Sequence, residues 1–273
     1  MEGTVYEVKK GGDRVNTYKF QKYIEFIQTK FIIMIKEKHF FSNGYNIRYL
    51  FEQNDSDTLV VIFSGFTRNG IKARYNYNRT LRNLKINKLF ILDNFGYDER
   101  GAYYLGHDMD FKIQNAVMEL IQKTQQTRNI KKSIYTGTSK GGYAALYFGL
   151  QEKDSIIIAG APQYYLGLYL NGTENYRKNC LPYIVGNEIT NEKIDLLNNL
   201  LPNKFKQCSN NNNSIYLHYS SMENTYRKQI KYLINDLNDN NYKLFENVEK
   251  YENHNDVSLF FPKYLIETIN EVI

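Results

Sequence analysis

Short apolar runs alternate with amphipathic stretches along most of the chain from about residue 57 onward. Buried strands are predicted for five continuous apolar runs: 58–63, 88–93, 133–136, 155–159 and 215–219. Apolar residues at helical spacing predict four helices: 111–123, 142–150, 224–237 and 257–273. Strands that alternate with helices in this way are typical of a parallel sheet covered by helices on both faces. The predicted fold class is therefore α/β, with a mostly parallel sheet.

Three segments depart from this alternation. Residues 18–38 carry apolar residues on one helical face, and residues 45–52 alternate like an antiparallel edge strand. We expect residues 1–56 to be an N-terminal extension packed on the same sheet, within one domain that spans residues 1–273. No strand pattern is evident in residues 163–213, which therefore form either a helical cap over the strand ends or a loose surface excursion.

Composition narrows the class of protein. With 42% hydrophobic and 23% charged residues, 17 Gly and 4 Pro, the chain is neither collagen-like nor Pro-rich and disordered. Its two cysteines cannot by themselves build a disulfide framework or a zinc site, which fits a reducing compartment. The longest apolar run near the start has five residues, far fewer than the roughly 20 of a membrane span. No signal-peptide pattern opens the chain. We expect a soluble, cytoplasmic protein without a membrane span.

The net charge of +6 is compatible with an anionic partner such as nucleic acid, a phosphorylated cofactor or an anionic glycan. However, 35 basic residues are interspersed with 29 acidic ones, and no block of like charge stands out. A compositional bias towards Lys, Asn, Ile, Tyr and Phe is the better explanation of the excess charge. We therefore expect no nucleic-acid partner, no metal site and no permanently bound cofactor.

The segment Gly137-Thr138-Ser139-Lys140-Gly141 lies directly between a predicted strand and a predicted helix. This is the context of a nucleophile elbow, in which a tight turn raises a serine above the carboxyl edge of the sheet. Side chains two residues to either side of that serine would collide, which explains the two glycines. The sequence therefore predicts Ser139 as a nucleophile, with a structural Gly-rich turn as the alternative.

A serine hydroxyl needs a base, and in this architecture an acid and then a histidine follow the serine along the chain. His254 lies in a polar loop before the last helix and is the predicted base, whereas His218 falls inside a strand. Glu223 follows the penultimate strand and is the predicted acid, whose carboxylate would hold the productive imidazole tautomer. Asp256 and Asp236 are the other candidates, and a helix-capping role for Glu223 is the alternative.

Negative charge that develops on a carbonyl oxygen requires hydrogen-bond donors. The backbone N–H of Lys140, the residue after the serine, is one predicted donor of this oxyanion hole. The other is expected from the turn after the first buried strand, at Phe66 or, less favoured, at Gly65.

Four segments together resemble the capsule polysaccharide O-acetyltransferases, in particular those of the meningococcal serogroup A type: residues 98–104, 137–142, 157–163 and 254–256. The resemblance runs from about residue 60 to the C-terminus. It implies an α/β-hydrolase fold and transfer of acetyl from acetyl-CoA to a sugar hydroxyl, with Ser139 as nucleophile and His254 as base. Glu223 matches the position of the acid, where the family pattern carries Asp. The resemblance also draws attention to Arg100, Tyr103 and Tyr104, which could hold CoA phosphates or a sugar ring; pairing of Arg100 with Asp98 or Asp108 is an equally good interpretation.

Three functions are compatible with the sequence. The leading hypothesis is an O-acetyltransferase that acts on a cell-surface or capsular polysaccharide, with acetyl-CoA as co-substrate and a glycan as acceptor. The second is a serine esterase or deacetylase, in which water attacks the same acetyl-enzyme. The third is a binding protein of a capsule locus or secretion system that keeps the fold without catalysis.

Overall fold

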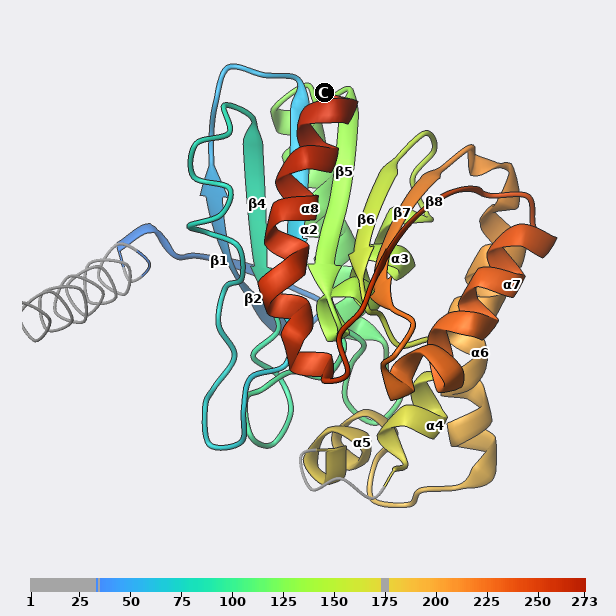
Figure 1. Ribbon diagram of the computed structural model, residues 1–273. Coiled ribbons are helices and arrows are strands. Elements are labelled where there is room, and N and C mark those ends of the chain that lie inside the picture. Colours follow the sequence, from blue (N-terminus) through green and yellow to red (C-terminus); the bar gives the residue numbers. More distant parts are fainter. Residues whose placement is uncertain (1–32, 34, 173–176) are drawn as a thin grey trace, which may run out of the picture. The chain divides into compact units, whose positions relative to one another are not determined.

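An eight-stranded sheet forms the centre of the computed structural model, which describes residues 33, 35–172 and 177–273 (Figure 1). The strand order is β1-β2-β4-β3-β5-β6-β7-β8. The strands are β1 (Lys38–Ser42), β2 (Tyr45–Glu52), β3 (Thr58–Phe63), β4 (Asn87–Leu92), β5 (Lys132–Thr138), β6 (Ile156–Gly160), β7 (Ser214–Ser220) and β8 (Lys243–Glu249). The six strands from β3 to β8 are parallel, whereas β2 pairs antiparallel with both β1 and β4.

Helices follow most of the parallel strands. They are α2 (Lys112–Thr127), α3 (Lys140–Gly149), α4 (Leu166–Leu170), α5 (Arg177–Val185), α6 (Asn191–Cys208), α7 (Lys231–Asp239) and α8 (Val257–Val272). Short 3-10 helices lie at η1 (Ser209–Asn211) and η3 (His254–Asp256), and a π-helical turn, η2 (Tyr226–Ile230), leads into α7. Within the described ranges, no helix is both long enough and apolar enough to span a membrane.

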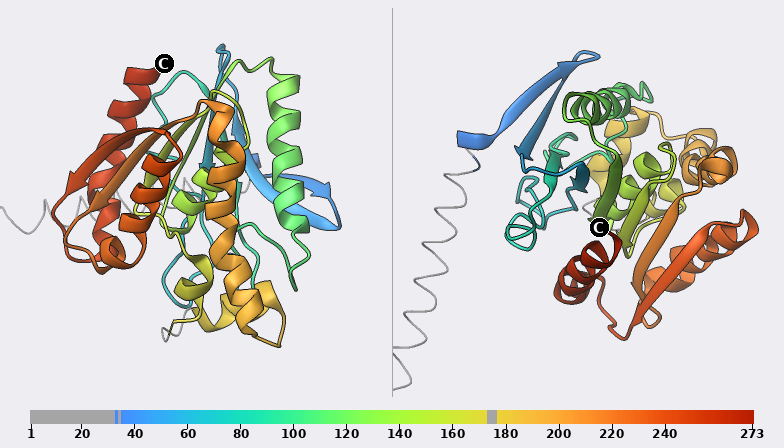
Figure 2. Two further views of the ribbon diagram at one scale, coloured as in Figure 1. Left: turned by 90° about the vertical axis from the view of Figure 1, so that its right-hand side faces the viewer. Right: turned by 90° about the horizontal axis from the view of Figure 1, so that it is seen from above.

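The helices cover both faces of the sheet. Helix α3 packs on β3, β5 and β6, and α2 packs near β1 and β2, whereas α8 contacts β5, β6 and β7 from the opposite face (Figure 2). The central strands β3 and β4 are buried along their whole length, as the continuous apolar runs require. The predicted α/β class, with a mostly parallel sheet between helices, is confirmed.

Strand β2 is antiparallel, as predicted, but it is not the edge of the sheet because β1 pairs with its outer side. Strands β1 and β8, the two real edges, were not predicted. Residues 38–52 of the expected N-terminal extension thus belong to the sheet. Most of the helix predicted for residues 18–38 lies outside the described residues, and Lys38 itself begins β1.

The order of the strands reverses beside β3, which lies between β4 and β5. Two chain segments therefore leave the carboxyl edge of the sheet side by side, one after Phe63 and one after Thr138. Crevices at such reversals are the usual ligand sites of open α/β sheets. The described residues of the segment expected as a cap, 163–213, contain α4, α5, α6 and η1, and α4 and α5 lie at this same edge (Figure 1).

Candidate active site

Ser139 forms a strained turn between β5 and α3. Its φ of 53° and ψ of −119° lie outside the common allowed regions for a non-glycine residue. The neighbouring glycines explain how the turn closes. A Cβ on Gly137 would lie 2.5 Å from the Gly141 carbonyl, and a Cβ on Gly141 would lie 2.6 Å from the Phe63 carbonyl oxygen. The backbone geometry predicted for a nucleophile elbow is present.

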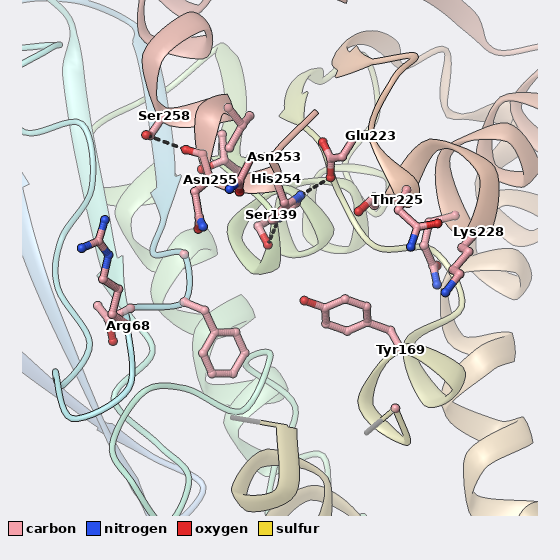
Figure 3. A pocket seen from close by; sticks show the side chains of 18 of the residues that line it. Arg68, Ser139, Tyr169, Glu223, Thr225, Lys228, Asn253, His254, Asn255 and Ser258 are labelled. Carbon is pink, nitrogen blue, oxygen red and sulfur yellow. Dashed lines mark hydrogen bonds and ion pairs between the residues drawn. The ribbon is translucent and has the colours of Figure 1, made fainter. Parts of the chain in front are cut away.

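The structure brings Ser139, His254 and Glu223 together (Figure 3). Ser139 Oγ lies 2.9 Å from His254 Nε2, and His254 Nδ1 makes a short hydrogen bond to Glu223 Oε1. The carboxylate accepts the Nδ1 proton, so Nε2 presents its lone pair to the serine hydroxyl. The Glu223 side chain is 4% exposed and the His254 side chain 30% exposed. The buried carboxylate therefore contacts an imidazole that is itself partly open to solvent.

The other candidate residues have different surroundings. His218 is fully buried in β7, where its Nδ1 lies 2.6 Å from Asn247 Oδ1, and burial lowers its pKa. Asp236 accepts a hydrogen bond from the Tyr164 hydroxyl, and Asp256 lies at the start of α8. Glu223 is thus the carboxylate in contact with His254.

The candidate oxyanion donors lie at the beginning of α3 and in the turn after β3. Lys140 is the first residue of α3, and the first N–H groups of a helix have no acceptor within the helix. In the turn, the Gly65 N–H donates to Asn76 Oδ1 at 2.9 Å, so that donor already has a partner. Phe66 lines the cleft beside Ser139.

The Lys140 side chain is buried beneath the candidate site. Its Nζ forms an ion pair of 2.8 Å with Asp93 Oδ2, and both side chains are fully buried. The same ammonium lies 5.3 Å from the centre of the Phe66 ring. Burial lowers the pKa of Lys140, and the Asp93 carboxylate opposes that shift.

The substrate-binding prediction for the two tyrosines needs correction. Tyr103 is 1% exposed and Tyr104 0% exposed, so neither ring can stack on a sugar. Their hydroxyls serve the interior: Tyr103 donates to Gln163 Oε1, and Tyr104 donates to the Ile91 carbonyl. They are buried because the loop after β4 folds back under the elbow instead of remaining on the surface.

Arg100 lines the cleft but is 3% exposed. Its guanidinium donates to the Thr67 carbonyl and lies 3.6 Å from the Asp98 carboxylate. The pairing with Asp98 that the sequence left open is therefore present. Arg100 therefore holds the turn after β3 in place, and little of its side chain is exposed to the cleft.

Gln163 is a site residue to which the sequence assigned no role. It lies three residues beyond β6, is fully buried, and its Nε2 lies 3.1 Å from Ser139 Oγ. Gln163 could have been identified from its position, because it follows β6, and β6 pairs with the strand that ends at the elbow. Side chains just past the carboxyl ends of neighbouring parallel strands lie close together.

A broad cleft of about 1730 Å³ opens above Ser139. The loop after β3 forms one wall, on which Arg68 lies, and α4, η2 and α7 form the opposite wall, on which Tyr169 and Lys228 lie (Figure 3). Arg74, from the same loop as Arg68, also lines the cleft. Small-molecule sites usually measure about 300–1,000 Å³. The cleft is therefore larger than the usual site for one small molecule. Among the described residues, no group of histidine, cysteine and carboxylate side chains is arranged to hold a metal ion.

Comparisons with known proteins bear on the fold. No protein-family model matches the sequence. Solved structures of the capsule O-acetyltransferase of Neisseria meningitidis serogroup A resemble this chain, with TM-scores of 0.70 and 0.69 and identities of 24% and 22%; the second is a mutant in complex with CoA. Each match covers 85% of this chain, and 92% and 94% of the respective solved chains. The resemblance to this group of proteins is confirmed at the level of the fold. Serine hydrolases are also among the similar structures, so the α/β-hydrolase-like fold is confirmed.

Two further relatives belong to larger proteins. A chain of the glycosylation-associated Gap123 complex of Streptococcus agalactiae has a TM-score of 0.71 at 19% identity, with 87% of this chain and 46% of that chain covered. An accessory Sec system protein of Staphylococcus aureus is 30% identical over 123 residues. That match spans 44% of this chain and only 22% of the staphylococcal protein.

Proposed function

We propose that this protein is an O-acetyltransferase that moves acetyl from acetyl-CoA to a hydroxyl group of a cell-surface or capsular polysaccharide. The observation that carries the proposal is the contact series from Glu223 through His254 to Ser139 at the base of a two-walled cleft. The structural likeness to a capsule O-acetyltransferase, one structure of which holds CoA, supports the choice of donor and acceptor.

The first half-reaction forms an acetyl-enzyme. His254 Nε2 removes the hydroxyl proton as Ser139 Oγ attacks the thioester carbonyl carbon, and the Glu223 carboxylate stabilises the imidazolium that forms. The tetrahedral intermediate then loses the sulfur, which receives the proton from His254. Acetyl remains on Ser139, and free CoA leaves.

The second half-reaction reverses the roles of the same groups. A sugar hydroxyl loses its proton to His254 and attacks the acetyl carbon, after which Ser139 Oγ leaves and recovers that proton. In both halves the oxyanion is bound by the Lys140 N–H and by a donor from the turn at Gly65 and Phe66, for which Gly65 would have to release Asn76.

The cleft supplies charge for the donor. CoA carries several phosphate groups, and the basic lining residues of the cleft outnumber its acidic ones: Arg68, Arg74, Arg100, Arg227 and Lys228 against Glu223 and Glu252. Aromatic side chains on the wall of α4 and α7, including Tyr165, Tyr169 and Tyr232, offer surfaces on which a sugar or a base can stack. Basic side chains for the CoA phosphates and aromatic side chains for a sugar are thus both present in the cleft that contains Ser139.

The experiment that tests the proposal is thiol release from acetyl-CoA by the wild type and by Ser139→Ala. We expect release by the wild type and loss of it in the variant, whose melting temperature should stay unchanged. An acetyl adduct on Ser139, detected by mass spectrometry after brief incubation, would identify the intermediate. Release that persists in Ser139→Ala contradicts the proposal.

An esterase or deacetylase is the second candidate, and the exposure of His254 favours it. With 30% of its side chain exposed above an open cleft, water has access to the base. An enzyme that cleaves p-nitrophenyl acetate but releases no thiol from acetyl-CoA would be an esterase. The non-catalytic binding role finds support in the likeness to the accessory Sec system protein and to the Gap123 chain, but the assembled contacts of Ser139 weigh against it.

A further inference from the structure

Ser139 has a second hydrogen-bond partner besides the base. Gln163 Nε2 lies 3.1 Å from Ser139 Oγ, and Gln163 Oε1 lies 3.1 Å from the hydroxyl of Tyr103. We propose that Gln163 is a catalytic residue that stabilises the alkoxide character of Ser139 Oγ, and that Tyr103 is the positioning residue that fixes the amide of Gln163. This inference rests on the acyl-transfer function proposed above.

The hydrogen-bond inventory determines which way the amide points. The Ser139 hydroxyl donates its proton to His254 Nε2, so Oγ can only accept from a second neighbour. The Gln163 NH₂ group can donate to Oγ, whereas its carbonyl oxygen there would meet another oxygen. The Tyr103 hydroxyl completes the arrangement because it donates to the carbonyl side of the same amide.

The backbone around Gln163 is held on both sides. Before it, the Ala161 N–H donates to the His218 carbonyl at 2.7 Å. After it, the N–H groups of Tyr164 and Tyr165 both donate to Gln229 Oε1, at 2.8 and 2.7 Å. The Gln163 side chain is fully buried, so water does not compete for its amide group on the side away from the cleft. Such preorganised donors are effective because they need no rearrangement when charge develops.

The amide acts at the same atom in both half-reactions. Negative charge grows on Oγ when His254 removes its proton, and it grows again when Oγ leaves the acetyl group. In each case the Gln163 N–H donates to the charged oxygen and transfers no proton, so the balance of atoms is that of the triad alone. Removal of this donor should therefore lower kcat and leave KM for acetyl-CoA nearly unchanged.

The test uses the full chain with Gln163→Met, Tyr103→Phe and the double variant. Methionine keeps the length of the side chain and removes the amide, and phenylalanine removes only the Tyr103 hydroxyl. We expect kcat for thiol release and for p-nitrophenyl acetate to fall about 10- to 100-fold in Gln163→Met, as for a hydrogen bond to a charged group. Tyr103→Phe should lose about 3- to 10-fold, and the double variant should equal Gln163→Met, since Tyr103 acts only through Gln163.

Tyr143→Phe is the matched control. Tyr143 is also fully buried, its ring centre lies 5.4 Å from that of Tyr103, and within the described part of the chain its hydroxyl has no hydrogen-bond partner. Its removal should leave kcat at the wild-type value. Circular dichroism and melting temperature establish folding of each variant, and Tyr103→Phe remains a test if Gln163→Met is unstable.

Several outcomes would overturn the inference. Gln163→Met with wild-type kcat would reduce Gln163 to a packing residue, and additive losses in the double variant would separate Tyr103 from it. The rate at which a fluorophosphonate probe labels Ser139 gives an independent readout, because it requires neither CoA nor acceptor. If the wild type labels at Ser139 but releases no thiol, the proposed donor is wrong while the role of Gln163 is still measured. A wild type that neither labels nor turns over refutes both proposals.

Discussion

At the scale of single residues, the main contact of the His254 imidazole besides Ser139 is the buried carboxylate of Glu223. Glu223 accepts a hydrogen bond from Nδ1 of His254. The Glu223 side chain is 4% exposed, so little water competes for its carboxylate. The side chain of Glu is one methylene longer than the Asp that the family pattern carries at this position, and Glu223 still contacts His254. The tautomer of His254 should therefore depend on the charge and the reach of this residue.

Glu223→Gln should lower kcat for p-nitrophenyl acetate by about 10²–10⁴-fold, because an amide can hold the wrong tautomer of the histidine. The kcat of Glu223→Asp should lie between those of Glu223→Gln and the wild type, because the shorter side chain keeps its charge but loses the close contact with His254. Both rates are measured beside the urea midpoint. A variant that loses stability but not turnover would indicate the helix-capping role instead.

The buried His218 should make stability depend on pH. Burial lowers its pKa in the folded state, so below the ordinary histidine value of about 6.5 the unfolded chain binds more protons than the folded one. The free energy of unfolding should therefore fall as the pH drops below about 6.5. His218→Phe should flatten this dependence between pH 7 and pH 5, as followed by melting temperature, whatever its effect at pH 7. His39→Gln, at an exposed position, is the control; an unchanged slope in His218→Phe would contradict the expectation.

Residue predictions from sequence depended on whether a motif fixes the local backbone. The turn at Ser139 could be predicted because its two glycines stand at the spacing of a nucleophile elbow between a strand and a helix. The contact of His254 with Ser139 could be anticipated because a polar loop precedes the last helix. Tyr103 and Tyr104 were misjudged because their burial depends on how the loop after β4 folds back, which no periodicity records. Gln163 was overlooked because its role exists only where β5 and β6 lie side by side.

At the scale of secondary-structure elements, the Lys140–Asp93 ion pair ties the start of α3 to the loop after β4. Asp93 also accepts hydrogen bonds from the N–H groups of Ala102 and Tyr104. A Cβ on Gly101 would lie 2.0 Å from Lys140 Nζ, so this loop must approach the ammonium without a side chain. One buried ammonium therefore contacts both the loop after β4 and the Phe66 turn, and joins them to the elbow.

Lys140→Met should destabilise the fold by about 3–5 kcal/mol, because it leaves the Asp93 carboxylate buried without its partner. Lys140→Met with Asp93→Asn should recover part of that loss, since the amide is neutral and its oxygen still accepts from the backbone. Urea unfolding measures both. Additive losses in the double variant would show that the pairing of the two charges is not what Lys140 contributes.

The elements that sequence identified least well are the edges of the sheet. Strand β8 has the sequence KLFENVE, and four of its seven residues are exposed. Most residues of β1 are exposed as well. An edge strand has a neighbour on one side only and needs no continuous apolar run, so its pattern is weak. The buried strands, by contrast, were predicted to within a few residues because burial on both faces demands an apolar run.

At the scale of the whole molecule, basic residues on opposite walls of the cleft offer two places for the phosphates of CoA. Arg68 lies on the wall after β3, and Lys228 lies on the wall of η2 (Figure 3). Arg74, from the same loop as Arg68, and Arg227, beside Lys228 in η2, also line the cleft. If the donor occupies one wall and the acceptor the other, neutralising a single wall should weaken donor binding selectively. The net charge of +6 alone would produce no such asymmetry.

We therefore expect one of two double variants, Arg68→Gln/Arg74→Gln or Arg227→Gln/Lys228→Gln, to raise KM for acetyl-CoA about tenfold or more. KM for p-nitrophenyl acetate, which carries no phosphate, should change little in either. Lys263→Gln is the control, because Lys263 is 82% exposed on α8 and does not line the cleft. Added salt should raise KM for acetyl-CoA in the wild type, because it screens the basic side chains of the cleft. The double variant with the raised KM lacks those charges, so its KM should depend less on salt. Equal KM values for acetyl-CoA in both double variants and the wild type would mean that the phosphates lie outside this cleft.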